Sequence, residues 1–339
     1  MTWWRQWRDS TTVQARIADW QASGALAPAA AHRAGELAGR QPSTVLWRGF
    51  LQHLSLWLAV ALLAAGLVCL VAANWEQLGR SARLYGGQAI LVLAVIAAWR
   101  LGLARAGGQA ALMLAAVALG GLLALLGQTY QTGADTWQLF ALWAALLVPW
   151  LFAARSTAMT LLWLVVAQLA LVLWLGEHGD GTRLIWLLVG LLNAGLHLAW
   201  HGPGQRLPGL AGTLGPRLLA LAALAVLVPA ALSDVFAWRG LHGTGLLACA
   251  LGACAIAWTA WRSPRDVLLL SAVALAVIVV DTAVLGRLLF ELRLEAMAFL
   301  LLTGAVIGQV AWVTRWLREL ARDGSVPVPV PAEGAAGDG

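Results

Sequence analysis

The 339 residues are 61% hydrophobic and 11% charged, whereas soluble globular domains average roughly 45 to 50% and 25%. This composition excludes an ordinary soluble domain and predicts an integral membrane protein. The formal net charge is +6, but the basic residues, all of them arginines, are spread along the chain and form no single basic domain. We therefore expect membrane lipids, and no nucleic acid, as partners.

The first fifty residues are polar and of mixed charge, without the short apolar core behind a basic start that marks a cleaved signal peptide. Apolar residues recur at helical spacing from Val13 to Trp20. Gly24 can end that helix, and Pro28 can begin a second one. The sequence therefore predicts a small cytosolic helical hairpin over residues 1–50.

From Leu54 onward the chain alternates apolar runs, mostly of about 16 to 20 residues, with short polar breaks. A helix of this length crosses a bilayer of roughly 30 Å and satisfies its own backbone hydrogen bonds in hydrocarbon. The ten predicted spans, of which the seventh is the shortest, are Leu54–Ala73, Leu84–Trp99, Ala110–Leu126, Trp137–Ala154, Ala158–Leu175, Leu184–Trp200, Leu218–Leu232, Leu241–Trp261, Val267–Leu285 and Ala296–Val313.

The predicted fold class is all-α. We expect a polytopic transmembrane bundle of about ten helices over residues 51–316, preceded by the cytosolic hairpin. Residues 317–339 are predicted to form a disordered cytosolic tail, because they contain alternating prolines and end in small and acidic residues.

Arginine placement predicts the orientation, since arginine-rich short loops stay in the cytoplasm. With the N-terminus inside, the inner segments hold twelve arginines, namely Arg40, Arg48, Arg100, Arg105, Arg155, Arg206, Arg217, Arg262, Arg265, Arg315, Arg318 and Arg322. The outer loops hold six, namely Arg80, Arg83, Arg183, Arg239, Arg287 and Arg293. They also hold seven acids, namely Glu76, Asp135, Glu177, Asp180, Asp234, Glu291 and Glu295. The sequence therefore predicts that both termini lie in the cytoplasm.

Many of the twenty tryptophans lie near the ends of the apolar runs. An indole ring prefers the interface between lipid tails and water. Trp137 and Trp174 are accordingly predicted at outer ends, and Trp150 and Trp200 at inner ends. These residues are interpreted as boundary markers and not as a binding site.

Polar residues inside the spans are candidates for function, because such residues are costly in lipid and often face the bundle interior. Asn193, His197 and His201 recur every four residues along the sixth span. Asn193 and His197 can hydrogen-bond a neighbouring helix while His201 is solvated. Alternatively, His53, His197 and His201 can ligate haem or another metal.

Asp281 is the acid that lies within an apolar run, about one turn before the predicted outer end of the ninth span. It can be a proton or cation site, as in transporters, or it can pair with Arg287 or cap a helix end near water. Gln168 and Gln309 are interpreted as interhelical hydrogen-bonding residues.

Signatures of catalysis are missing from the sequence. It contains no HExxH zinc motif, no GxSxG elbow, no Gly-rich dinucleotide turn and no lysine at all. Its three cysteines lie inside apolar runs without metal-ligand spacing. We therefore predict no enzyme, no catalytic residues, no cofactor and no metal site.

Two polar segments carry a family resemblance. VAANWEQLGRSARL, at residues 71–84, resembles the end of the first membrane helix in the bacterial family called domain of unknown function 2157, where Ala-x-Asn-Trp precedes a short turn. LGQTYQTGAD, at residues 126–135, resembles the segment after that family's third helix, matched by Gly127, Gln128, Tyr130 and Asp135. The resemblance covers about residues 20–150. It implies a polytopic bacterial inner-membrane protein with a cytosolic N-terminal helical region, and it implies no reaction.

The same two segments supply a candidate outer site. Its residues are Asn74, Trp75, Glu76, Gln128, Tyr130 and Asp135. They can be structural, with Gly127 and Gly133 permitting the turns where a helix ends. Alternatively, they can form a shared outer pocket in which Asp135 pairs with Arg80 or Arg83.

Three functions remain open. The favoured hypothesis is a non-enzymatic membrane protein that contacts partner proteins, a second copy of itself or lipids through its outer loops and its cytosolic hairpin. The alternative is a transporter for a small solute or ion that uses Asn193, His197 and Asp281. The third is an intramembrane enzyme or haem protein built on the histidines.

Overall fold

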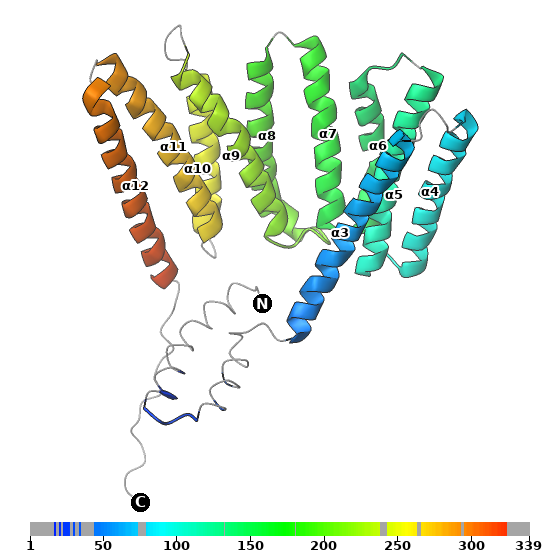
Figure 1. Ribbon diagram of the computed structural model, residues 1–339, viewed down its shortest axis with the longest axis horizontal. Coiled ribbons are helices and arrows are strands. Elements are labelled where there is room, and N and C mark those ends of the chain that lie inside the picture. The colour runs from blue at the N-terminus through cyan, green and yellow to red at the C-terminus, as the bar shows by residue number, and fades with distance from the viewer. Residues whose placement is uncertain are drawn as a thin grey trace, which may run out of the picture. The chain divides into compact units, whose positions relative to one another are not determined.

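The computed structural model describes residues 44–73, 79–131, 133–179, 181–237, 243–262, 266–292 and 295–323, with a few positions between 17 and 34. These residues form α-helices and one short 3-10 helix, and no strand occurs among them. Consecutive helices run in opposite directions (Figure 1). The elements are α3 (Thr44–Ala73), α4 (Arg80–Leu101), α5 (Ala106–Tyr130), α6 (Thr136–Ala154), α7 (Thr157–His178), α8 (Thr182–His201), η1 (Pro203–Arg206), α9 (Leu214–Val235), α10 (Thr244–Arg262), α11 (Val267–Glu291) and α12 (Glu295–Asp323).

Within the described chain, ten helices are long and apolar enough to cross a membrane. Each corresponds to one predicted span, so the all-α polytopic bundle is confirmed. We call the side of the connections α5–α6, α7–α8, α9–α10 and α11–α12 the Tyr130 end. We call the opposite side the Arg155 end. It holds the connections α4–α5, α6–α7, α8–α9 and α10–α11.

Several helices extend beyond the predicted apolar runs. Helix α5 continues to Tyr130, so the first half of LGQTYQTGAD is helical, and α11 continues to Glu291. Helix α12 continues to Asp323, so residues 317–323 are helical although they were assigned to the tail. The physical reason is that charged residues such as Arg318 and Glu319 are good helix formers once a helix leaves the hydrocarbon.

Most of the predicted N-terminal hairpin and the tail from residue 324 lie outside the described residues. The turn that ends the first predicted helix is described. Gly24 has a φ of +74°, and the amide of Leu26 donates to the carbonyl of Trp20 at 3.0 Å. This left-handed glycine turn ends a helix, as the sequence predicts.

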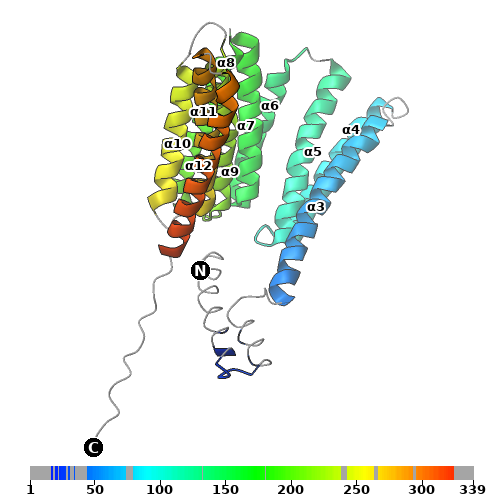
Figure 2. The same cartoon turned by 60° about the vertical axis from the view of Figure 1, so that its left-hand side comes forward.

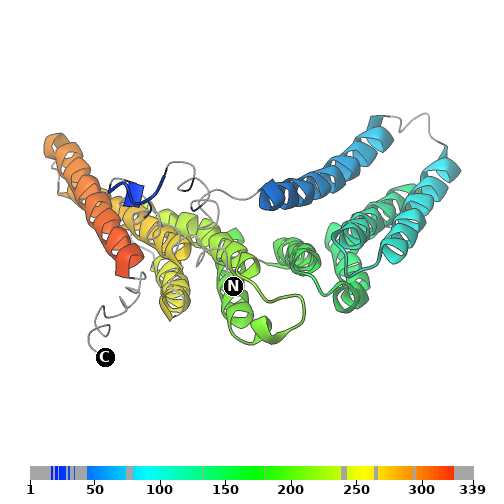
Figure 3. The same cartoon turned by 90° about the horizontal axis from the view of Figure 1, so that it is seen from below.

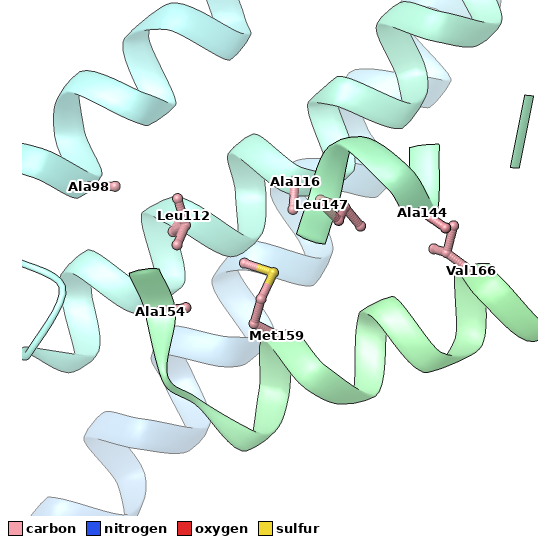
Figure 4. Close-up of a cluster of buried hydrophobic side chains, with 8 residues drawn as sticks. All are labelled: Ala98, Leu112, Ala116, Ala144, Leu147, Ala154, Met159 and Val166. Atoms are coloured by element: carbon pink, nitrogen blue, oxygen red, sulfur yellow. The ribbon is translucent and has the colours of Figure 1, made fainter. Parts of the chain in front are cut away.

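Helices α4 to α7 pack in chain order around a cluster of small and apolar side chains (Figure 4). Its residues are Ala98, Leu112, Ala116, Ala144, Leu147, Ala154, Met159 and Val166. Two indoles reinforce the packing. Trp143 of α6 donates to the carbonyl of Ala116 in α5, and Trp163 of α7 donates to that of Ala144 in α6, both at 3.0 Å. Small residues and polar links of this kind hold helices together in lipid, where the hydrophobic effect between them is weak.

Helices α8 to α11 form the second group, in which each of α8, α10 and α11 packs against α9 (Figure 2). Half of the residues in the membrane-spanning part of α9 are buried, more than in any other described span. The shortest predicted span is therefore the most enclosed helix. Glycines make the close packing possible, because Leu227 of α9 is fully buried between Gly190 of α8 and Gly252 of α10.

Trp200 departs from its prediction as a boundary residue. Its ring is buried at the end of α8, and its indole donates to the carbonyl of Leu210 at 3.0 Å. A Cβ atom on Gly215 would lie 2.5 Å from the ring, so the missing side chain of that glycine leaves the space for it. Trp200 thus packs the α8–α9 connection and does not lie in the lipid interface.

Helices α3 and α12 are the least enclosed described spans. None of the residues in the membrane-spanning part of α3 are buried, and only 6% of those in α12 are. Helix α12 lies beside α11 at the edge of the second group in two views (Figures 1 and 3). The rings of Phe290 and Phe299 meet edge to face with centroids 6.1 Å apart, which joins these two helices near the Tyr130 end.

Candidate functional site

The polar residues predicted inside the spans are bonded to neighbouring helices. Asn193 of α8 and Gln168 of α7 form a reciprocal amide pair. Asn193 Nδ2 donates to Gln168 Oε1 at 2.8 Å, and Gln168 Nε2 donates to Asn193 Oδ1 at 3.3 Å. Asn193 Nδ2 also donates to the carbonyl of Val189. The prediction that Asn193 and Gln168 make interhelical hydrogen bonds is confirmed, and each is the other's partner.

His197 is fully buried where α8, α9 and α10 meet. Its Nδ1–H donates to the carbonyl of Pro216 at 2.7 Å, because a carbonyl can only accept. Its Nε2 is 2.7 Å from the hydroxyl of Thr259, which also lies 2.8 Å from the carbonyl of Ile256. In the neutral ring Nε2 is an acceptor, so the Thr259 hydroxyl donates to it. The ring therefore ties three helices together.

The haem or metal hypothesis requires a histidine nitrogen with a free lone pair. Both ring nitrogens of His197 are hydrogen-bonded, so ligation would require one of these bonds to break. The His201 ring lies against it, with centroids 5.8 Å apart. No group of three or more histidine, cysteine or acidic side chains within the described ranges has the arrangement of a metal site. The geometry of His197 is that of a structural residue.

We expect Thr259→Val to lower the free energy of unfolding by about 1 kcal/mol, since it keeps the shape but leaves buried Nε2 of His197 unpaired. Unfolding of the purified protein in detergent measures the change. Thr303→Val is the matched control, because that exposed hydroxyl donates to the carbonyl of Phe299 in its own helix and, among the described residues, to no neighbouring helix. Equal effects of the two substitutions would contradict the assigned role of Thr259.

An ion pair at the Tyr130 end joins α8, α9 and α10. Asp234 was predicted to lie in an outer loop, but it belongs to the last turn of α9 and is fully buried. Its Oδ1 accepts from Arg183, which also donates to the hydroxyl of Thr244 at 2.8 Å. Its Oδ2 accepts from the amide of Gly245 at 2.6 Å and from that of Leu246 at 3.2 Å. Asp234 therefore caps the start of α10 from another helix.

A second ion pair at the Arg155 end joins α9 to α11. Arg217 Nε donates to Asp266 Oδ2 at 2.7 Å, and both side chains are largely buried. Asp266 is also the N-cap residue of α11, where its Oδ1 accepts from the amide of Leu269 at 3.4 Å. Acidic residues thus hold the first turns of both α10 and α11, which is favourable at the positive end of a helix dipole.

Three of the predicted outer-site residues, Asn74, Trp75 and Glu76, lie outside the described residues. The other three, Gln128, Tyr130 and Asp135, are exposed at the Tyr130 end. The guanidinium of Arg80 lies 4.4 Å from the centre of the Tyr130 ring, a cation–π contact that joins the start of α4 to the end of α5. Asp135 precedes α6 and accepts from Gln138 Nε2 at 3.4 Å. A shared pocket with residues 74–76 therefore stays a prediction.

The turn in this segment differs from the prediction. Gly127 is helical, and the left-handed residues are Gln131, with a φ of 45°, and Gly133, with a φ of +66°. Gln131 is the C-cap residue of α5. The change follows from the greater length of α5, which moves Gln128 and Tyr130 from a loop onto the last turn of a helix.

Asp281 accepts a hydrogen bond from Gln309 Nε2 of α12, so the interhelical role predicted for Gln309 is confirmed. The predicted pairing of Asp281 with Arg287 is wrong. Arg287 donates instead to Glu291 at 2.7 Å and to the carbonyl of Val235. The capping role is also wrong, because α11 continues ten residues beyond Asp281.

Sequence reasoning missed several residues of these networks, above all Arg183, Asp234 and Thr259. Arg183 and Asp234 stand at the ends of apolar runs, where charged residues are ordinary, and they are 51 positions apart. Their pairing depends on how α8 and α9 pack. A weak signal existed in the threonine of the eighth span, since a hydroxyl in lipid needs a partner.

Comparison with known proteins finds a family match within the first half of the chain. Residues 18–160 match the family model described as predicted membrane protein (DUF2157). This part of the chain is similar to that family. The resemblance carried by residues 71–84 and 126–135 is thereby confirmed, and both segments lie inside the match. The packed group α8–α11 lies beyond it. The chain matches no curated protein and no solved structure.

Proposed function

We propose that this membrane protein of the DUF2157 family is not an enzyme and acts through contacts with partner proteins, a second copy of itself or lipids. In this proposal it resides in the bacterial inner membrane with both termini in the cytoplasm. The outer segments at the Tyr130 end and the N-terminal hairpin make the contacts.

The observation that carries the proposal is the internal use of the buried polar side chains. Asn193 bonds Gln168, His197 bonds Pro216 and Thr259, and Asp234 bonds Arg183 and the start of α10. A reactive centre needs groups that are held ready for a substrate. These groups hold helices together, which supports a rigid scaffold.

Exposed residues at the Tyr130 end supply a surface for a partner. Tyr130 is 56% exposed although it is aromatic, and the adjacent Arg80 and Gln128 are also exposed. Tyrosine and arginine are the residue types that most often anchor protein interfaces. Their cation–π contact orders both side chains before a partner binds, which lowers the entropy cost of binding.

Site-specific photo-crosslinking in cells tests this proposal. A photoreactive residue at Tyr130 is expected to yield a reproducible protein adduct. The matched position is Leu93, which is exposed on the apolar surface of α4 and is expected to label lipid only. The proposal would fail if Tyr130 and Leu93 gave the same adducts and if deletion of residues 1–45 had no phenotype.

A transporter of a small solute or ion is the alternative, and one observation favours it. Asp281 is an acid in the middle of a span, and its side chain is exposed on the helix surface. Flux into liposomes that contain the purified protein, measured with a panel of solutes, discriminates the two functions. No flux for any solute, or a flux that Asp281→Asn leaves unchanged, would exclude transport through this residue.

A further inference from the structure

The seam between α11 and α12 contains polar groups at a depth where hydrocarbon surrounds the protein. Asp281 lies 14 residues after Val267 and 10 before Glu291, the first and last residues of α11. At about 1.5 Å per residue, these separations are roughly 21 and 15 Å. The hydrocarbon core of a bilayer is about 30 Å thick, so Asp281 lies well inside it.

Two contacts define which side of α11 faces α12. The rings of Phe290 and Phe299 meet, and a Cβ atom on Gly286 would lie 3.6 Å from Leu302. Thr282 precedes Gly286 by four residues, so it lies on the same stripe of α11, one turn deeper in the membrane. Gln309, on the antiparallel α12, reaches the carboxylate of Asp281 at this level. Asp281, Thr282 and Gln309 thus lie at one depth of the seam.

Two buried side-chain oxygens of this seam accept no hydrogen bond from the described residues. Thr282 Oγ1 and Gln309 Oε1 are both buried, and neither has a hydrogen-bond partner among the residues that the structure describes. Asp281 is bonded to a neutral amide, and Arg287, the next arginine along α11, is bonded to Glu291 and Val235. Unpaired oxygens and an uncompensated carboxylate are costly in hydrocarbon.

We propose that the α11–α12 seam binds a monovalent metal cation such as Na⁺ through Asp281, Thr282 and Gln309. A carboxylate, a hydroxyl and an amide carbonyl are the oxygen ligands that hard cations prefer. One carboxylate balances one positive charge, whereas a divalent ion would leave a net charge in lipid. The bound cation supplies the missing partner for both buried oxygens and neutralises Asp281. This site is independent of the proposed partner surface at the Tyr130 end.

Thermal unfolding of the full chain in detergent, at constant pH and ionic strength, tests the inference. Replacement of choline chloride by NaCl is expected to raise the unfolding midpoint, by about 3 °C at a Na⁺ concentration tenfold above the dissociation constant. LiCl and KCl report the size preference. Asp281→Asn is expected to abolish the response, and Glu291→Gln, which changes an exposed acid of the same helix, is expected to keep it.

Thr282→Val provides a second variant in case Asp281→Asn does not fold. Loss of one oxygen ligand is expected to raise the Na⁺ concentration for half-maximal stabilisation about tenfold. Identical midpoints in choline and in all three metal chlorides would overturn the inference. A response that survives in both variants would also overturn it, as would a midpoint that depends on pH but on no metal cation, which assigns the seam to a proton.

Discussion

Asp234→Ala is expected to lower the free energy of unfolding by about 3 kcal/mol. Removal of one partner of a buried pair costs roughly 3 to 5 kcal/mol, because the other charge is left uncompensated. The lower value applies here, since the Arg183 side chain is 38% exposed and can turn toward water. The first amides of α10 also lose their acceptor. Unfolding of the purified protein in SDS titrations measures the change.

The control for Asp234 is Glu291→Gln. Glu291 also pairs with an arginine, but its side chain is 60% exposed, so a loss below about 0.5 kcal/mol is expected. In a double-mutant cycle, Arg183→Ala combined with Asp234→Ala should cost less than the sum of the single changes, because the pair couples. Additive losses, or a loss for Asp234→Ala as small as that for Glu291→Gln, would show that Asp234 does not hold α8, α9 and α10 together.

Gly190→Ala is expected to destabilise the protein by about 2 kcal/mol, although alanine is the better helix former. The new Cβ atom would lie 2.5 Å from Leu227, and a Cβ atom on Gly252 would approach Leu227 equally closely from the other side. Leu227 is fully buried, so its side chain would have to shift against the residues packed around it. Overpacking of this kind costs about 1 to 3 kcal/mol. The same unfolding titration measures the loss of stability in Gly190→Ala.

Gly195→Ala is the matched control, since Gly195 belongs to the same helix and nothing lies within 4 Å of its added Cβ atom. That substitution is expected to be neutral or to stabilise by about 0.5 kcal/mol, through the lower entropy cost of alanine. Shortening the opposing residue should relieve the clash, so Gly190→Ala combined with Leu227→Ala should cost less than the two losses added. If Gly190→Ala behaved like Gly195→Ala, the close packing of α8 on α9 would be refuted.

The candidate sites were predictable to different degrees. Asn193 and His197 could be predicted as hydrogen-bonding residues, because polar groups in lipid require partners and spacing by four residues puts them on one face of α8. Their partners Gln168, Pro216 and Thr259 could not be derived, since the choice depends on which helices become neighbours. Asp281 illustrates the same limit. Its nearest opposite charge along the chain was Arg287, but its actual partner is an amide 28 residues away.

The sequence by itself determined the class of the protein, the number of its spans and its helical form. These follow from local physics, because the length of an apolar run and the need to satisfy every backbone group in hydrocarbon leave the helix as the spanning form. The residue motifs that carry the family resemblance are local as well.

Only the tertiary structure decided which helix forms the centre and which polar groups pair. Helix α9 was predicted as the shortest span, yet it is the most enclosed, because Gly190 and Gly252 of its neighbours admit Leu227. Asp234 was predicted in a loop, yet it caps α10 from within the protein. Contacts between residues distant in sequence depend on the shapes of both helix surfaces, and no single apolar run contains that information.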